Sequence, residues 1–232
     1  ARSADLIRLN ASRGGPIYAW ARTGQRTPIA LNLADVPEPG RQGYVVGAHA
    51  LQDVQLELHY QQPGNMPVRD NSGLRIILSD KAPEYPLHVA FLYAHVDIPA
   101  HSTAQMCRQC YVRRGGAVVG YRVHAHRFAR RIWSEHKRGG IRMARLGEQD
   151  AQQAQVFHLL PQERMLKTGD TLTVHCEYEN DSDNTVLLGY DERTEEMCNH
   201  YLLASADLEV DCDWDGFARD GWNSTQMSGC HE

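Results

Sequence analysis

Hydrophobic and polar positions alternate along this chain in short runs, and long stretches of helical periodicity are hard to find. Such alternation is typical of strands with one buried face. The runs cover residues 54–60, 74–78, 87–96, 117–123, 171–176 and 201–205. Turn-forming residues separate them at 37–40, 62–65, 115–116, 139–140 and 167–170. The pattern predicts an all-β fold, most simply an antiparallel β-sandwich.

Domain boundaries follow from where this alternation stops. Residues 61–72 are polar, contain two prolines and a glycine, and predict a linker. Residues 73–232 are long enough for one compact sandwich, whereas residues 1–60 are too few for another and are expected to be the C-terminal remnant of a first domain. The basic segment 126–140 predicts a hairpin or an exposed ribbon whose charge is solvated.

Composition removes several classes of protein. Hydrophobic residues make up 42% of the 232 positions and charged residues 23%, as in ordinary globular domains, so disorder and coiled coil are set aside. The net charge of -5 gives no positive field for a polyanion, so nucleic acid is not expected as a partner. No apolar run approaches the roughly 18 residues that span a bilayer, so no membrane span is expected in this chain.

The cysteines indicate an oxidising compartment. Their number is even, and sequons at Asn10, Asn180 and Asn223 accompany them, which together favour a glycoprotein of the secretory lumen or the extracellular space. The pair at 107 and 110 could form half of a zinc site, but a second C-x-x-C is missing, so disulfides are favoured over zinc. Spacing alone selects none of the fifteen possible connectivities. The six are Cys107, Cys110, Cys176, Cys198, Cys212 and Cys230.

Two histidines could bind one metal. His124 and His126 are two residues apart in a predicted strand, so both imidazoles lie on the same face, and Arg122 shares that face. With 12 histidines in the chain, an H-x-H also arises readily by chance, and two hydrogen-bonded histidines of a sheet are the competing interpretation.

A second strand could complete the set of ligands. Alternation sends Met197, Asn199 and Tyr201 to one side and Cys198 to the other. Two imidazoles and a thioether suit copper that cycles between Cu(I) and Cu(II), and three protein ligands leave an open position. A neighbouring arginine would suit an anionic substrate. The competing interpretations are that the methionine fills the core and that the arginine forms a surface ion pair.

The motifs that carry these residues resemble a known family. Residues 121–126 (YRVHAH) and 195–201 (EEMCNHY), with shorter matches at 18–22, 58–60, 98–100 and 168–170, are similar to the copper type II, ascorbate-dependent monooxygenases. Within that family they are most similar to the branch that hydroxylates peptidylglycine. The resemblance covers most of the chain up to about residue 206.

The resemblance implies roles for the candidate residues. His124, His126 and Met197 match the ligands of the copper that binds dioxygen. The residues that match those holding the terminal carboxylate of the substrate are Arg122, Asn199 and Tyr201. A disulfide of the family matches Cys176–Cys198. The arrangement in the branch of the family that hydroxylates dopamine implies Cys107–Cys212 and Cys110–Cys230.

The resemblance also implies a second copper, which relays electrons from ascorbate. His59 matches one ligand of that copper, but the adjacent pair of histidines that the site also needs does not occur in this sequence. An N-terminal copper domain is therefore expected to be supplied elsewhere, and this chain is expected to bind one copper well.

The implied activity is hydroxylation of the α-carbon of a C-terminal glycine in a glycine-extended peptide, the first step of peptide amidation, with copper, ascorbate and dioxygen. Two alternatives remain open. One is a catecholamine-type β-hydroxylase of the same family, against which Arg122 argues because an amine substrate offers no carboxylate. The other is a non-catalytic copper-binding β-sandwich.

Overall fold

The computed structural model describes residues 6–11, 16–21, 42–47, 50–59, 76 and 78–212. Every regular element in these residues is a strand, and none of them forms a helix able to cross a membrane. The strands are β1 Leu6–Ala11, β2 Pro16–Ala21, β3 Gln42–Gly43, β4 Val54–His59, β5 Tyr85–Ala94, β6 Asp97–Ile98, β7 Ser102–Arg114, β8 Gly116–His124, β9 Ala129–Arg138, β10 Ile141–Asp150, β11 His158–Leu166, β12 Thr171–Asn180, β13 Val186–Leu187, β14 Cys198–Ser205 and β15 Glu209–Asp211.

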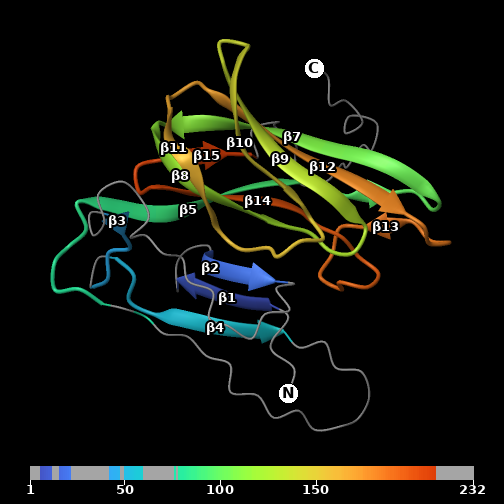
Figure 1. Ribbon diagram of the computed structural model, residues 1–232, viewed down its shortest axis with the longest axis horizontal. Coiled ribbons are helices and arrows are strands. Elements are labelled where there is room, and N and C mark those ends of the chain that lie inside the picture. The colour runs from blue at the N-terminus through green and yellow to red at the C-terminus, as the bar shows by residue number, and fades with distance from the viewer. Residues whose placement is uncertain are drawn as a thin grey trace, which may run out of the picture.

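Two five-stranded sheets form a sandwich, as the alternating pattern predicts (Figure 1). One sheet has the order β10-β9-β12-β7-β15 and the other β11-β8-β14-β5-β3; all their pairings are antiparallel except β3 with β5. Apolar side chains from both sheets fill the space between them. Leu92 and Leu202 from one sheet and Ile132 and Leu172 from the other are all 0% exposed and belong to one core cluster.

The N-terminal strands form a sheet of their own, with the order β2-β1-β4 (Figure 1). The Tyr44 hydroxyl, which follows β3, donates to the backbone oxygen of Ile17 in β2 at 2.7 Å. The expected linker at 61–72 lies outside the described residues, so the division into two domains stays a prediction. In the run expected at 74–78, residues 76 and 78 are not in a strand and the others are not described.

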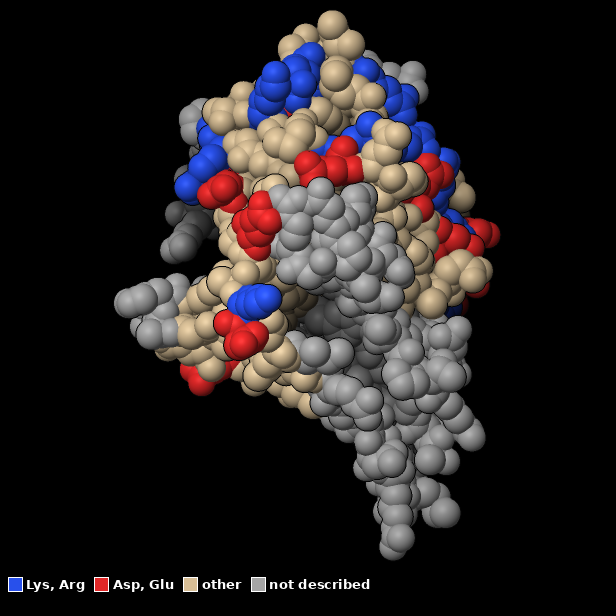
Figure 2. Space-filling model, turned by 60° about the vertical axis from the view of Figure 1, so that its left-hand side comes forward, with Lys and Arg blue, Asp and Glu red and all other residues tan. Residues whose placement is uncertain are grey.

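The basic segment 126–140 forms most of a hairpin. Strand β9 pairs with β10, and Gly139 and Gly140 turn the chain with φ of 55° and 80°, in the region that favours glycine. On the face shown in Figure 2, cationic side chains lie toward the top of the described part, with anionic side chains beside and below them. Arg142 pairs with Glu135 at 2.6 Å, and other arginines of β9 and β10 form further ion pairs, so the basic charge of this hairpin is paired and solvated.

Two disulfides join described residues, and two of the three expected pairings, Cys107–Cys212 and Cys110–Cys230, are wrong. Cys176 of β12 is bonded to Cys198 of β14, across the two sheets, as expected. However, Cys110 is bonded to Cys212 rather than to Cys230, and Cys107 is disulfide-bonded as well. The reason is strand alternation.

Cys107 and Cys110 lie three residues apart on the continuous strand β7, so their side chains point to opposite faces. Cys110 lies in the core cluster together with Cys212, while Cys107 does not. Because all described cysteines are disulfide-bonded, the zinc alternative for this pair is excluded. Cys230 itself lies outside the described residues.

One of the three sequons is buried. Asn180 is 2% exposed, and its amide nitrogen donates to the backbone oxygens of Ile98, Pro99 and Asn184 at 2.9–3.2 Å. A glycan on this nitrogen would displace those hydrogen bonds, so the folded chain does not offer this site. Asn223 and the side chain of Asn10 lie outside the described residues.

Candidate metal centre

Two neighbouring strands bring the predicted site residues together. In the register of β8 with β14, Arg122 lies opposite Tyr201 and His124 lies opposite Asn199. Directly opposite residues of an antiparallel pair share a face. Val123, which lies between Arg122 and His124 in β8, belongs to the core cluster. The four side chains of the two pairs therefore lie on the face turned away from the sandwich core. All four are nevertheless buried, none being more than 8% exposed.

The two histidines bond through Nδ1 to oxygen acceptors, which fixes the position of the proton on each ring. His124 Nδ1 lies 2.7 Å from Gln155 Oε1, and His126 Nδ1 lies 2.9 Å from the backbone oxygen of Glu195. Both oxygens can only accept, so both Nδ1 atoms carry the proton. In a neutral ring Nε2 is then the nitrogen without a proton, and a metal-binding histidine uses a nitrogen of this kind. The two ring centroids are 5.4 Å apart.

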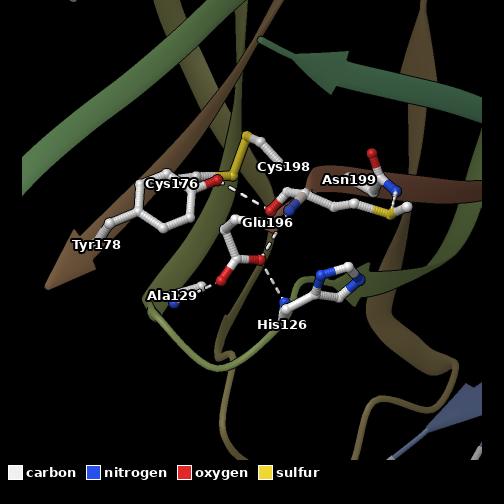
Figure 3. The surroundings of a disulfide bond; sticks show 8 residues. His126, Ala129, Cys176, Tyr178, Glu196, Cys198 and Asn199 are labelled. Atoms are coloured by element: carbon white, nitrogen blue, oxygen red, sulfur yellow. Dashed lines mark hydrogen bonds between the residues drawn. A yellow bond between two sulfur atoms is a disulfide. The ribbon is translucent and has the colours of Figure 1, made fainter. Parts of the chain in front are cut away.

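Met197 lies one residue before β14 and is 7% exposed. The Asn199 amide nitrogen contacts its sulfur at 3.3 Å, which places the thioether on the same side of the strand as Asn199 (Figure 3). Cys198 points the other way, into the disulfide with Cys176. The alternation expected for this segment is therefore present, and the methionine is not part of the core cluster.

The backbone beside Met197 is held from the opposite side. The Tyr178 hydroxyl donates to the Met197 backbone oxygen at 2.9 Å, beside the disulfide of the two sheets (Figure 3). Burial raises the pKa of Tyr178 well above its usual value, so the hydroxyl keeps its proton and remains a donor. The thioether thus extends from a segment whose backbone is fixed.

Gln155 is a site residue that the sequence did not reveal. It is 0% exposed and lies in the connection between β10 and β11. Its amide nitrogen donates to the backbone oxygens of Ala125 and Ala151, both at 2.8 Å, which turns its Oε1 toward His124. Its own backbone oxygen accepts from Arg122 Nε at 3.0 Å. One loop residue therefore contacts both the candidate ligand and the candidate substrate-binding arginine.

Arg122 is fixed by its neighbours although it is charged. Its side chain is 1% exposed, and its guanidinium carbon lies 5.1 Å from the ring centroid of Tyr201. The Tyr201 ring in turn stacks on Phe91 at 4.9 Å. A cation over an aromatic face is attracted by the ring electrons, and the attraction grows when water is excluded. The interpretation of Arg122 as a surface ion pair is therefore wrong.

The donor set fits a copper ion. Among the described residues no three His, Cys, Asp and Glu side chains form a metal-binding group, so a third ligand for the histidine pair has to be of another type. The thioether of Met197 is the candidate. Two imidazole nitrogens and a soft sulfur suit copper better than magnesium, calcium or structural zinc.

His59, the predicted ligand of a second copper, ends β4 and pairs with Leu6 of β1 through the backbone. Its side chain lies outside the described residues, so its role stays a prediction.

A disulfide-linked β-sandwich that carries two imidazoles and a thioether beside one sheet is the arrangement expected of a β-sandwich domain with a copper centre. Comparison with protein families makes the assignment specific. The model of the copper type II ascorbate-dependent monooxygenase C-terminal domain matches residues 93–212, more than half of the chain. The chain belongs to this family, and the matched range contains every candidate site residue except His59.

Individual relatives show the same family. The chain is 23% identical to a tyramine beta-hydroxylase of Caenorhabditis briggsae over 78% of its own length and 34% of the relative. It is 27% identical to the putative DBH-like monooxygenase protein 2 of Homo sapiens over 64% of its length and 33% of the relative. It is 28% identical to the DBH-like monooxygenase protein 1 of Gallus gallus over 81% of its length and 32% of the relative. The chain thus spans about a third of the length of these relatives.

Proposed function

We propose that this chain carries the oxygen-binding copper site of a monooxygenase that hydroxylates the α-carbon of a C-terminal glycine in peptides. His124, His126 and Met197 would hold the copper. When bound, copper supplies the one-electron chemistry that activates dioxygen, with ascorbate as the reductant of the family. Because the chain spans about a third of its relatives, this activity is proposed for the full-length protein, in the secretory lumen or outside the cell.

The observation that carries the choice of substrate is Arg122. It lies in the strand that holds His124, on the same face, and both contact Gln155. A cation fixed next to a metal centre attracts an anionic group of a substrate and repels an ammonium group. A C-terminal carboxylate is the anion that a peptide offers there, and a planar guanidinium can bind it through two parallel hydrogen bonds.

The neighbouring side chains would complete the binding of the glycine. Tyr201 lies under the Arg122 guanidinium, and Asn199 contacts the Met197 sulfur. Both would orient the carboxylate, so that the α-carbon lies within reach of the reacting oxygen. The low exposure of all these residues keeps water from the reacting carbon and strengthens the electrostatic contacts.

The electron supply requires groups beyond this centre. His59 is the candidate from this chain for the copper that relays electrons, and the missing adjacent histidines would come from an N-terminal copper domain. A chain without those ligands would bind copper at His124, His126 and Met197 but turn over poorly.

A second candidate function is hydroxylation of an aromatic amine, as the name of the tyramine beta-hydroxylase indicates for that relative. A third is a copper-binding sandwich without catalysis. Arg122 is the residue that distinguishes the first candidate from the second.

The test is turnover by the full-length protein with copper and ascorbate. We expect hydroxylation of a short peptide that ends in glycine, and none of the same peptide with its carboxylate amidated. Arg122→Lys should raise KM for the peptide at least tenfold, because a lysine cannot form the bidentate pair. Met197→Ile should keep the fold and abolish turnover. Oxidation of tyramine without oxidation of the peptide would reject the peptide as substrate, and no turnover of either would favour the non-catalytic sandwich.

A further inference from the structure

A single buried carboxylate joins the two segments that carry the candidate ligands. Glu196 is 0% exposed, and its Oε1 accepts hydrogen bonds from the backbone amides of both His126 and Met197, the latter at 2.7 Å. Its Oε2 accepts from the amides of Phe128 and Ala129 at 2.9 and 3.1 Å. Figure 3 shows the carboxylate between the turn and the strand.

These contacts connect distant parts of the chain. His126 is 70 residues from Glu196 in sequence, whereas Met197 is its neighbour. One oxygen atom therefore fixes the distance between the backbone of one candidate imidazole ligand and the backbone of the thioether ligand. The other oxygen holds the turn that leads from β8 into β9.

Other contacts hold these ligands one at a time. Of the candidate copper ligands, Tyr178 bonds to the backbone of Met197 and Gln155 bonds to the ring of His124. The backbone oxygen of Glu195 accepts from His126 Nδ1 and so orients that ring. Among the described contacts, the Glu196 carboxylate alone bonds to the backbone of two candidate ligands.

A carboxylate suits this position better than an amide. It accepts only, and its two oxygens offer about four lone-pair sites, which match the four amide donors. An amide of the same shape would turn an N–H group toward two backbone N–H groups. This would leave at least two buried N–H donors without an acceptor, and the turn after β8 could then move away from the start of β14.

We infer that Glu196 is a positioning residue that sets the separation of His126 and Met197 and so builds the copper centre. The inference rests on the proposed copper site. It predicts that the loss of this carboxylate changes the metal coordination and not only the stability of the fold.

The test compares two buried carboxylates by copper affinity and by X-ray absorption of bound Cu(I). Asp170 is the matched control, since it is 2% exposed and accepts from three groups that are not candidate ligands, Arg138, His136 and the amide of Lys167. Glu196→Gln should weaken copper binding about 10–100-fold, as expected when support of metal ligands is lost, and should remove the sulfur scatterer. Asp170→Asn should lower the melting temperature but keep the affinity and the sulfur.

One further measurement keeps the inference testable if the variant does not fold. Amide hydrogen exchange of the unmodified protein needs no variant: the amides of His126, Phe128, Ala129 and Met197 should be protected, and exchange at the rate of exposed amides would overturn the inference even if Glu196→Gln fails to fold. A folded Glu196→Gln protein with unchanged copper affinity and an intact sulfur shell would overturn it as well. If the unmodified protein binds no copper with a sulfur ligand, the proposed copper site fails instead.

Discussion

Replacing Gln155 by methionine removes three hydrogen bonds from a fully buried position without a large change in volume. The carboxamide bonds to the His124 ring at 2.7 Å and to the backbone oxygens of Ala125 and Ala151 at 2.8 Å each. Leaving a buried polar group without its partner costs about 1–3 kcal/mol, so three such groups should lower the free energy of unfolding by roughly 4 kcal/mol. Without its acceptor the His124 ring is also free to rotate, which should weaken copper binding about 10–100-fold.

Urea unfolding and a competition assay for copper measure the two effects separately. Gln152→Met is the control, since Gln152 lies in the same connection and its amide donates to the backbone oxygens of His126 and Ala129. It should change copper affinity less than threefold. If Gln155→Met is destabilised but binds copper as tightly as the unmodified protein, the carboxamide does not orient His124. If neither the free energy of unfolding nor the copper affinity changes, Gln155 does not form these buried hydrogen bonds.

Two other predictions concern the sandwich itself. The disulfide between Cys176 and Cys198 closes a loop with a sequence separation of 22, so replacing both by serine should lower the free energy of unfolding by about 3 kcal/mol in urea titrations. An unchanged midpoint would contradict this. Burial lowers the pKa of His200 from 6.5 to about 4, so the unfolded chain binds a proton that the folded chain does not. The free energy of unfolding should therefore be unaffected by His200 above about pH 6.5 and should fall by roughly 3 kcal/mol as the pH drops to 4. His200→Leu should flatten that slope in a pH series of urea titrations, and an unaltered slope would assign the effect to other groups.

Strand alternation predicted the parts of the site that lie within one strand. It placed His124 with Arg122, and Asn199 on the side opposite to Cys198, because side chains two residues apart share a face. Gln155 gave no such signal. It lies in a connection about thirty residues after the histidine, and only the packing of that connection against β8 brings it to the ring.

The same rule explains the error in the cysteines. The sequence pattern did not mark residues 102–114 as a strand, because their alternation is interrupted by polar positions on both faces. Without that strand, Cys107 and Cys110 looked equivalent. Once the strand is known, a separation of three residues makes them face opposite sides, and only Cys110 can reach a partner in the core.

The core and the candidate centre depend on one register. Val123 of β8 and Leu202 of β14 are 0% exposed in the core, and their neighbours in sequence, His124 and Tyr201, face the centre. A slip of one residue between these strands would turn the apolar side chains out and the site residues in, which the burial of the core opposes. The hydrophobic side chains therefore decide which polar side chains meet at the centre, while the disulfide and the buried carboxylate of Glu196 hold Met197, the candidate ligand that precedes β14.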